Sequence, residues 1–327
     1  MKIGLIDVDG HNYPNLPLMK ISAWHKSQGD DVEWYDLINA TIHFMTTGEN
    51  MYDKVYMSKV FSFTPDFDEM IYANEIERGG SGYCITNVDG KEIFDKSKDK
   101  ELPYEIEHIY PDYSLYPEQT KDTAYGFMSR GCPRGCDFCH VKTKEGLMSH
   151  KVADLSEFWN GQKHIELLDP NTLACKEWKD ILRQLIDSKA RVNFNQGLDI
   201  RMMTEEKAQM LSKIPLDAIH FAWDRYEDKK IIVPKFEMFR KASKINSHNL
   251  QVYVLCGFNT TIEQDLERIY TLRNMNGEDK GYAPYVMLYN KYNIPKGHEL
   301  LKLQRWVNNR FIFWKCKTFD EYLARGE

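Results

Sequence analysis

Three cysteines stand close together, and their spacing is the strongest chemical signal in the chain. Cys132, Cys136 and Cys139 are separated by three and then two residues within the segment 131–139, GCPRGCDFC. The proline and glycines disfavour a regular helix, so this loop can curl and turn several sulfur atoms inward. Thiolates are the usual ligands of iron–sulfur clusters, and a cubane cluster normally takes four. Three thiolates leave one iron open to bind and activate a substrate.

Two other interpretations of these cysteines stay open from the residues alone. The first is a zinc site completed by His140, although zinc sites usually combine two separated ligand pairs and the second pair is missing here. The second is a chance grouping without a metal. Bunched thiols in a cytosolic chain are more often metal ligands than disulfides. The remaining cysteines are far apart and are interpreted as reduced, isolated thiols: Cys84, Cys175, Cys256 and Cys316.

The loop resembles the signature of radical S-adenosylmethionine (SAM) enzymes, in which three cysteines at this spacing bind a [4Fe-4S] cluster. In that family the open iron chelates the amino and carboxylate groups of SAM. An electron, supplied by a small flavodoxin- or ferredoxin-type protein, then cleaves a carbon–sulfur bond and gives methionine and a 5′-deoxyadenosyl radical that abstracts hydrogen from the substrate. The resemblance implies that Cys132, Cys136 and Cys139 are the catalytic cluster ligands, and that Phe138, just before the third cysteine, lies near adenine.

The first elements that must position this loop alternate between strand and helix. Residues 2–8, 32–36 and 54–62 are short apolar runs typical of buried strands, and Asn15 can cap the helix between the first two. Such alternation predicts a wound parallel sheet. We therefore expect a Rossmann-like N-terminal domain over residues 1–90.

A second alternation begins near Ala124. Its strands are expected at 124–130, 164–169, 191–197, 218–223, 250–258 and 283–289, with helices near 174–188, 204–213, 235–244 and 262–274. Six strands interleaved with helices predict a partial (β/α)6 TIM-type barrel with its site at the carboxyl ends of the strands. The family likewise places its cluster loop after the first barrel strand. The predicted segments are a connector at 91–120, the barrel at 121–295 and a C-terminal helical extension at 296–327.

The strand ends offer contacts for the rest of SAM. Many members of the family hold the amino group with a Gly-Gly-Glu motif after the second strand, where this chain has Asp169 before a proline. Asp169 could accept a hydrogen bond from the amino group, or it could be a simple turn residue. After the third strand come Gln196, Asp199 and Arg201. Arg201 could pair with the methionine carboxylate or with Asp199.

Two later strand ends complete this set. Asp224 could bind the ribose hydroxyls, or form a surface salt bridge with Arg225 or Lys229. Gly257 and Phe258 resemble the backbone segment that lies against adenine in the family, and glycine permits close approach of a ligand. These assignments follow from the resemblance.

The N-terminal domain is similar to the one that precedes the barrel in cobalamin-binding radical SAM enzymes. Residues that could contact cobalamin follow the first and third strands or lie in a glycine-rich loop: Asp9, His11, Ser62, Thr64, Gly79 and Gly80. Pro14 stands where the cobalamin motif has glycine, and it restricts the backbone there. The alternative is a degenerate domain that binds substrate or only packs on the barrel.

Composition limits the remaining functions. The chain has 327 residues, 42% hydrophobic, and a formal net charge of −6, which argues against a protein that coats nucleic acid. No apolar run approaches the length of a membrane span, and Asp7 and Asp9 interrupt any signal-peptide core, so we expect a cytoplasmic protein. The basic and aromatic C-terminal tail is interpreted as amphipathic helix.

Two enzymatic versions stay open. One is a cobalamin-dependent methyltransferase acting on an unactivated carbon, and the other is a cobalamin-free radical enzyme performing oxidation, epimerisation or rearrangement. A zinc-stabilised interaction protein is the alternative from another class. No residue pattern identifies the substrate.

Overall fold

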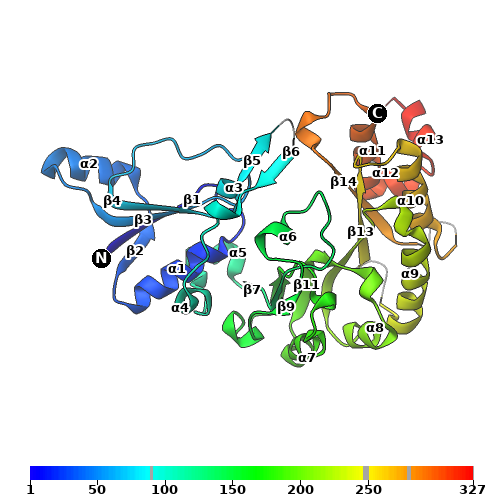
Figure 1. The fold of residues 1–327 in the computed structure, drawn as a ribbon, viewed down its shortest axis with the longest axis horizontal. Helices are drawn as coiled ribbons and strands as arrows, with labels where there is room; N and C mark the ends of the chain where they lie inside the picture. The colour runs from blue at the N-terminus through cyan, green and yellow to red at the C-terminus, as the bar shows by residue number, and fades with distance from the viewer. Residues whose placement is uncertain (89–90, 246–249, 278–280, 327) are drawn as a thin grey trace. The chain divides into compact units, whose positions relative to one another are not determined.

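The chain folds into two compact α/β units in the computed structural model (Figure 1). The first unit comprises Met1–Gly126 with Leu155–Gln162, and the second comprises Phe127–Asp154 with Lys163–Glu327. The structure describes the whole chain except these residues: 89–90, 246–249, 278–280 and 327.

The first unit contains a four-stranded sheet with the order β2-β1-β3-β4. Every neighbouring pair in it is parallel. The strands and their two main helices are β1 (Lys2–Asp7), α1 (Leu16–Ser27), β2 (Asp31–Trp34), α2 (Leu37–Thr47), β3 (Tyr52–Ser58) and β4 (Ala73–Gly79). This order reverses between β1 and β3, which is the point where doubly wound sheets bind ligands. The expected wound parallel sheet is confirmed, with β4 as a further strand.

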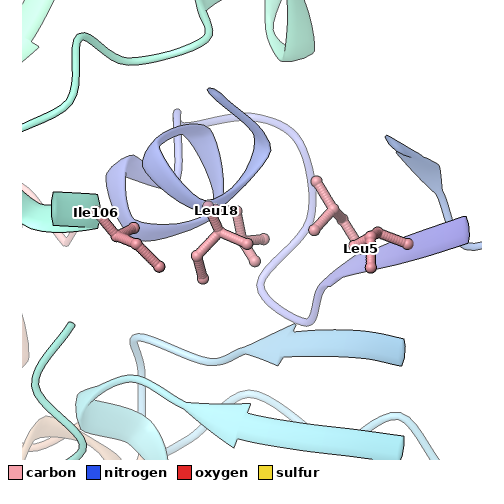
Figure 2. Close-up of a cluster of buried hydrophobic side chains, with 5 residues drawn as sticks. Leu5, Leu18 and Ile106 are labelled. Carbon is pink, nitrogen blue, oxygen red and sulfur yellow. The ribbon is translucent and has the colours of Figure 1, made fainter. Parts of the chain in front are cut away.

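Apolar side chains from alternate positions of the strands fill both faces of this sheet. On one face Leu5 of β1 packs with Leu18 of α1 and with Ile106 (Figure 2). The Asn15 side chain caps α1 by accepting from the Leu18 N–H, as the sequence indicated. Ile106 comes from the segment 91–120, which we expected to be only a connector. An apolar residue of that segment instead completes the core.

The rest of the first unit consists of short elements. They are α3 (Ser81–Cys84), the antiparallel hairpin β5 (Ile85–Val88) and β6 (Lys91–Phe94), α4 (Tyr104–Glu107) and α5 (Pro117–Thr120). None of the helices in the described part of the chain is long and apolar enough to cross a membrane.

The longest sheet has six strands in the order β14-β13-β12-β11-β10-β7. All pairs from β10 to β14 are parallel. The strands are β7 (Thr123–Gly126), β10 (His164–Leu167), β11 (Arg191–Leu198), β12 (Leu216–Ala222), β13 (Leu250–Cys256) and β14 (Ala283–Leu288). The predicted α/β class and the second run of parallel strands are confirmed.

Helices separate these strands in the sequence. They are α7 (Trp178–Ser188), α8 (Glu205–Leu211), α9 (Lys229–Ser243) and α10 (Ile262–Asn274), and α10 packs on β13 and β14 (Figure 1). Thr261 and Gln264 form the predicted capping box of α10. The tail forms α11 (Glu299–Asn308), α12 (Arg310–Lys315) and α13 (Phe319–Ala324), and α11 packs on β14. A small ladder joins β8 (Ser129–Arg130) to β9 (His150–Lys151), and α6 (Val141–Lys144) lies between them in sequence.

Candidate functional site

The cysteine loop follows β8 and contains no regular helix or strand until α6. Its two glycines have left-handed φ angles, +83° at Gly131 and +58° at Gly135. A Cβ atom at Gly131 would lie 2.2 Å from the Met148 carbonyl oxygen. Gly131 is therefore required by both its backbone conformation and the close approach of Met148.

Hydrogen bonds fix the two ends of this loop. The Glu145 carboxylate accepts from the Gly131 N–H at 3.0 Å and from the Arg130 guanidinium at 3.1 Å. The Cys132 N–H donates to the Gly146 carbonyl at 3.3 Å, and the Cys139 N–H donates to the Cys136 carbonyl at 3.1 Å. These hydrogen bonds join the start of the loop, at 131–132, to residues 145–146, and they close a turn between Cys136 and Cys139.

The three thiols lie within electrostatic range of one another. Burial raises the pKa of the Cys136 thiol, and the Asp224 carboxylate and the other two cysteines raise it further. Burial also raises the pKa of the Cys139 thiol, with Cys132 adding to the shift. Within the described ranges no three His, Cys, Asp or Glu side chains converge on a single ion position. A cubane differs from such a site because each thiolate binds a different iron atom.

A buried asparagine contacts the first cysteine. The Asn171 amide nitrogen lies 3.3 Å from the Cys132 sulfur, and Asn171 is 2% exposed. Its Oδ1 atom is buried and has no hydrogen-bond partner in the described part of the chain. Leaving a buried acceptor unpaired costs about 1–3 kcal/mol. A ligand that donates a hydrogen bond beside Cys132 would remove this cost.

Asp169, expected as the acceptor for the amino group, is already occupied by protein donors. Its carboxylate accepts from the Met128 N–H at 2.7 Å, the Ser129 hydroxyl at 2.5 Å and the Thr172 hydroxyl at 3.1 Å. Burial raises the pKa of Asp169 to about 6, against these hydrogen bonds. Asp169 therefore joins the end of β10 to the segment that leads into the cysteine loop.

The shifted pKa of Asp169 predicts a pH dependence of stability. The folded carboxyl holds its proton up to about pH 6, whereas the unfolded one loses it near its model value of 3.8. Between about pH 4 and about pH 7 the free energy of unfolding of the wild type should therefore fall, relative to Asp169→Asn, by on the order of 2 kcal/mol. Urea denaturation across this range measures it. Asp187→Asn on the exposed side of α7 is the control, and curves for Asp169→Asn that stay parallel to the wild type would contradict the prediction.

Arg201 and Asp199, after β11, belong to a chain of ion pairs. The Asp199 carboxylate accepts from the Arg201 Nε at 2.7 Å and also from Arg134 of the cysteine loop. Arg201 further contacts Asp228. Both arginines are thus paired with carboxylates, and their shared partner Asp199 ties the cysteine loop to the end of β11. Gln196 is exposed on a bulge of β11 and is not part of this chain.

One pocket of about 140 Å³ adjoins the cysteine loop. Its lining brings together three segments that are far apart in sequence: Arg134–Phe138, Asp224–Glu227 and Phe258–Thr260. Phe138 and Phe258 meet edge to face, with ring centroids 5.2 Å apart. Three of the predicted ligand contacts, Phe138, Asp224 and Phe258, therefore line the same pocket as Cys136.

Asp224 lines this pocket. No hydrogen bond or salt bridge to it occurs among the residues that the structure describes, so the expected salt bridge to Arg225 or Lys229 is absent there; Arg225 pairs with Glu227, and Lys229 with Glu267. Burial raises the pKa of Asp224 to about 6, although nearby arginines lower it. The group can accept hydrogen bonds from a ligand at neutral pH.

A buried arginine of α10 holds the strand ends that form the pocket. The Arg268 guanidinium donates to the carbonyls of Trp223 at 2.7 Å, Asp224 at 2.9 Å and Leu255 at 2.7 Å. It also pairs with the Asp265 carboxylate at 2.5 Å, and both side chains are 0% exposed. The other Asp265 oxygen accepts from the Gly257 N–H at 3.2 Å. Arg268 and Asp265 thus fix the ends of β12 and β13 relative to each other.

In the first unit, Asp9 is held by backbone of the segment after β3. Its carboxylate accepts from the N–H groups of Val60 at 2.5 Å and Phe61 at 3.3 Å, and from the Thr64 hydroxyl at 2.6 Å. The structure therefore joins Asp9 and Thr64, two of the expected cobalamin contacts, by a direct hydrogen bond. These hydrogen bonds connect the loop that follows β1 to the loop that follows β3.

The other predicted contacts of this unit are dispersed. His11 is exposed and stacks on Trp34 with centroids 4.1 Å apart. The Ser62 hydroxyl donates to Glu92 of the β5–β6 hairpin at 2.5 Å. Neither side chain is in the hydrogen-bonded group around Asp9.

The glycine-rich segment at the end of β4 contacts the chain just after β3. Gly80 has φ +97°, and a Cβ atom there would lie 2.3 Å from the Lys59 carbonyl oxygen. Gly79 has no atom within 4 Å of such a Cβ. Contact with the chain's own backbone therefore explains Gly80, while Gly79 borders open space.

Sequence reasoning missed several residues that the structure places at the site. Asn171 lies two residues after the predicted Asp169, and Arg134 lies inside the cysteine motif. Their closeness in sequence to predicted site residues could have identified them. The rest lie in segments that connect the main strands and helices, and their residue types alone carry no such signal: Glu145, Tyr226, Glu227, Asn259 and Thr260.

Comparison with known proteins assigns no family, because no family model matches the chain and no curated protein matches it. The chemistry of the site must therefore be judged from the cysteine loop, the pocket and their contacts.

Proposed function

We propose that this protein is a radical SAM enzyme whose three loop cysteines hold a [4Fe-4S] cluster and whose adjoining pocket receives SAM. The supporting observation is the pocket itself, in which Phe138, Asp224 and Phe258 meet beside Cys136. In the sequence these three residues belong to segments that are far apart. When bound, the cluster supplies the electron that splits the carbon–sulfur bond of SAM.

We also propose that the six-stranded sheet is the partial (β/α)6 barrel of this family. Its strands follow one another in sequence order from β7 to β14 without the reversal seen in the first unit. Because parallel crossovers share one hand, an order without reversal puts every helix on the same face, as in a barrel. The pocket and the cysteine loop adjoin the carboxyl ends of these strands, where barrel enzymes bind their substrates.

The protein's own groups suit the parts of SAM. The unpaired Asn171 Oδ1 can accept a hydrogen bond from the amino group beside Cys132. The Asp224 carboxylate can accept from the ribose hydroxyls, and the edge-to-face rings of Phe138 and Phe258 can flank adenine. Asn171 thus takes the role that we expected of Asp169, whose oxygens are already used.

Replacing Asn171 with alanine should weaken SAM binding. The variant loses an acceptor for a charged amino group, which corresponds to about a 10- to 100-fold increase in Kd. Isothermal titration of the reconstituted protein with SAM measures the change. Asn12→Ala, an exposed position in the first unit, is the control. Unchanged affinity in Asn171→Ala, with iron content retained, would contradict this role.

The test of the proposed function is anaerobic reconstitution followed by incubation with SAM and a strong reductant. Release of 5′-deoxyadenosine is the expected result, and iron with acid-labile sulfide should accompany it. Stoichiometric zinc after anaerobic purification, without iron and without SAM cleavage, would instead support the zinc-stabilised interaction protein. Formation of S-adenosylhomocysteine by protein that carries a corrinoid would support the methyltransferase version.

The contacts of the first unit favour the cobalamin-free version. Asp9 and Thr64 are hydrogen-bonded to each other. The Lys59 backbone occupies the space where a side chain at Gly80 would lie, and His11 stacks on Trp34. Most of the groups expected to meet a corrinoid therefore have partners within the unit. We accordingly propose oxidation, epimerisation or rearrangement rather than methyl transfer.

A further inference from the structure

One face of the long sheet carries partly exposed polar and aromatic side chains. Strand register puts them on the same face, because Glu166 lies opposite Asn193, Ala222 lies opposite Tyr253, and alternate residues of a strand share a face. The residues between them point to the other face and are buried. We call the first set the acceptor face, and its members are Glu166, Asn193, His220, Tyr253 and Tyr285.

Glu166 and Asn193 leave one oxygen unsatisfied. The Asn193 Nδ2 donates to the Glu166 carboxylate at 2.7 Å. Because an ionised carboxylate only accepts, the amide nitrogen must face Glu166, which leaves the Asn193 Oδ1 on the other side. That oxygen is buried and without a partner among the described residues. The pair therefore offers the Asn193 Oδ1 and the Glu166 carboxylate as acceptors.

His220 offers a third acceptor on the same face. Its Nδ1 lies 3.1 Å from the Phe194 carbonyl oxygen, so Nδ1 carries the hydrogen. Burial lowers the pKa of His220 from 6.5, so the ring is neutral at physiological pH. The other ring nitrogen, Nε2, is then an acceptor. No hydrogen bond to Nε2 occurs in the part of the chain that the structure describes.

Aromatic rings stand beside these acceptors. His220 and Tyr253 stack with centroids 5.0 Å apart and planes at 6°, and Tyr285 meets Tyr253 at 5.9 Å, near perpendicular. The only guanidinium that β11 contributes is that of Arg191, and it is already paired with Asp217. The acceptor face thus combines lone pairs and π faces with the Glu166 carboxylate as its charged member. The Arg310 guanidinium is near enough to His220 to contribute to the lowering of its pKa.

We propose that the acceptor face is the substrate subsite and that the substrate presents a cationic nitrogen group, an alkylammonium or a guanidinium. Such a group donates several hydrogen bonds, matches the Glu166 charge and interacts favourably with aromatic faces. An anionic group would be repelled by Glu166, and a group without N–H or O–H donors would leave Asn193 Oδ1 and His220 Nε2 unpaired; a neutral donor would forgo the attraction to the Glu166 charge.

This inference rests on the proposed function, because the acceptor face is a substrate site only if the protein is the proposed enzyme. His220 lies within β12, and Asp224 follows the end of that strand, four residues later, which corresponds to at most about 13 Å of extended chain. The acceptor face is therefore carried by the same strands as the pocket, and it lies farther from their carboxyl ends.

The test is calorimetric titration of the reconstituted protein with three probes: Nα-acetyl-arginine amide, Nα-acetyl-lysine amide and Nα-acetyl-citrulline amide. The citrulline probe has the shape of the arginine probe without its charge. We expect the two cationic probes to bind at least about tenfold more tightly than the neutral one. Binding of only one cationic probe would identify which nitrogen group the face takes. Equal affinity for the charged and neutral probes, or no saturable binding of either cation, would overturn the proposal.

Matched variants locate the effect. Glu166→Gln keeps the Asn193 hydrogen bond and should remove most of the preference for cations, and His220→Phe keeps the ring stack but loses an acceptor. Glu237→Gln, exposed on α9, is the control. Loss of the preference in Glu237→Gln, or its retention in both acceptor-face variants, would overturn the assignment. Probe binding is independent of SAM cleavage, so failure here and failure to release 5′-deoxyadenosine are separate results.

Discussion

Cys139→Ala is expected to lose iron and to release no 5′-deoxyadenosine above the protein-free background. Removing one of three thiolates would leave two irons of the proposed cubane without protein ligands. Iron and acid-labile sulfide per chain, followed by chromatography of the SAM cleavage products, measure the two losses.

A buried cysteine outside the loop provides the control. Cys84 lies in α3 of the first unit and is 1% exposed. Cys84→Ala should keep full iron content even if it is somewhat less stable. If Cys139→Ala retained iron and activity, or if Cys84→Ala lost them equally while still folded, the three loop cysteines would not be the cluster ligands.

Asp265→Ala is expected to destabilise the protein by about 3–5 kcal/mol. The substitution removes the carboxylate that pairs with the Arg268 guanidinium, which is 0% exposed, and no other carboxylate of the described residues pairs with it. The three backbone carbonyls that Arg268 also contacts cannot neutralise a full charge. The Gly257 N–H loses its acceptor as well. Urea denaturation monitored by circular dichroism measures the effect.

An exposed ion pair gives the comparison for Asp265. Glu206 of α8 pairs with Lys179, and the two side chains are 55% and 47% exposed. Glu206→Ala should cost less than about 1 kcal/mol. Similar losses in Asp265→Ala and Glu206→Ala would show that the buried pair is not important for stability. A large loss confined to Asp265→Ala, with weaker SAM binding in the folded fraction, is what its place behind the pocket predicts.

Local signals in the sequence were enough to locate most of the parallel strands and their helices. Asn15 and the Thr261–Gln264 pair were readable because capping needs only nearby residues. β4 escaped prediction because it is an edge strand whose residues, Ala73–Gly79, are mostly polar and exposed. Such a strand lacks the apolar run that identifies a buried one.

The site was predictable only where a residue's type decides its role. The cysteines and Phe138 could be named from spacing, but the choice between Asp169 and Asn171 could not. That choice depends on which side-chain oxygen already accepts hydrogen bonds from the protein, as the Asp169 carboxylate does from Met128 and Ser129. Hydrogen-bond satisfaction is a property of the folded chain. The acceptor face was likewise missed because neighbouring strands, not neighbouring residues, assemble it.

The ion-pair chain after β11 has a consequence for ligand discrimination. Arg134, Asp199, Arg201 and Asp228 alternate in sign and cancel one another. The other charged lining residues are paired as well, Asp137 with Lys142 and Arg225 with Glu227. Asp224 therefore contributes an unpaired negative charge among the described lining residues, which favours a positively charged sulfonium over a neutral thioether of the same shape. In the proposed enzyme this electrostatic bias would keep demethylated SAM from acting as a strong competitive inhibitor.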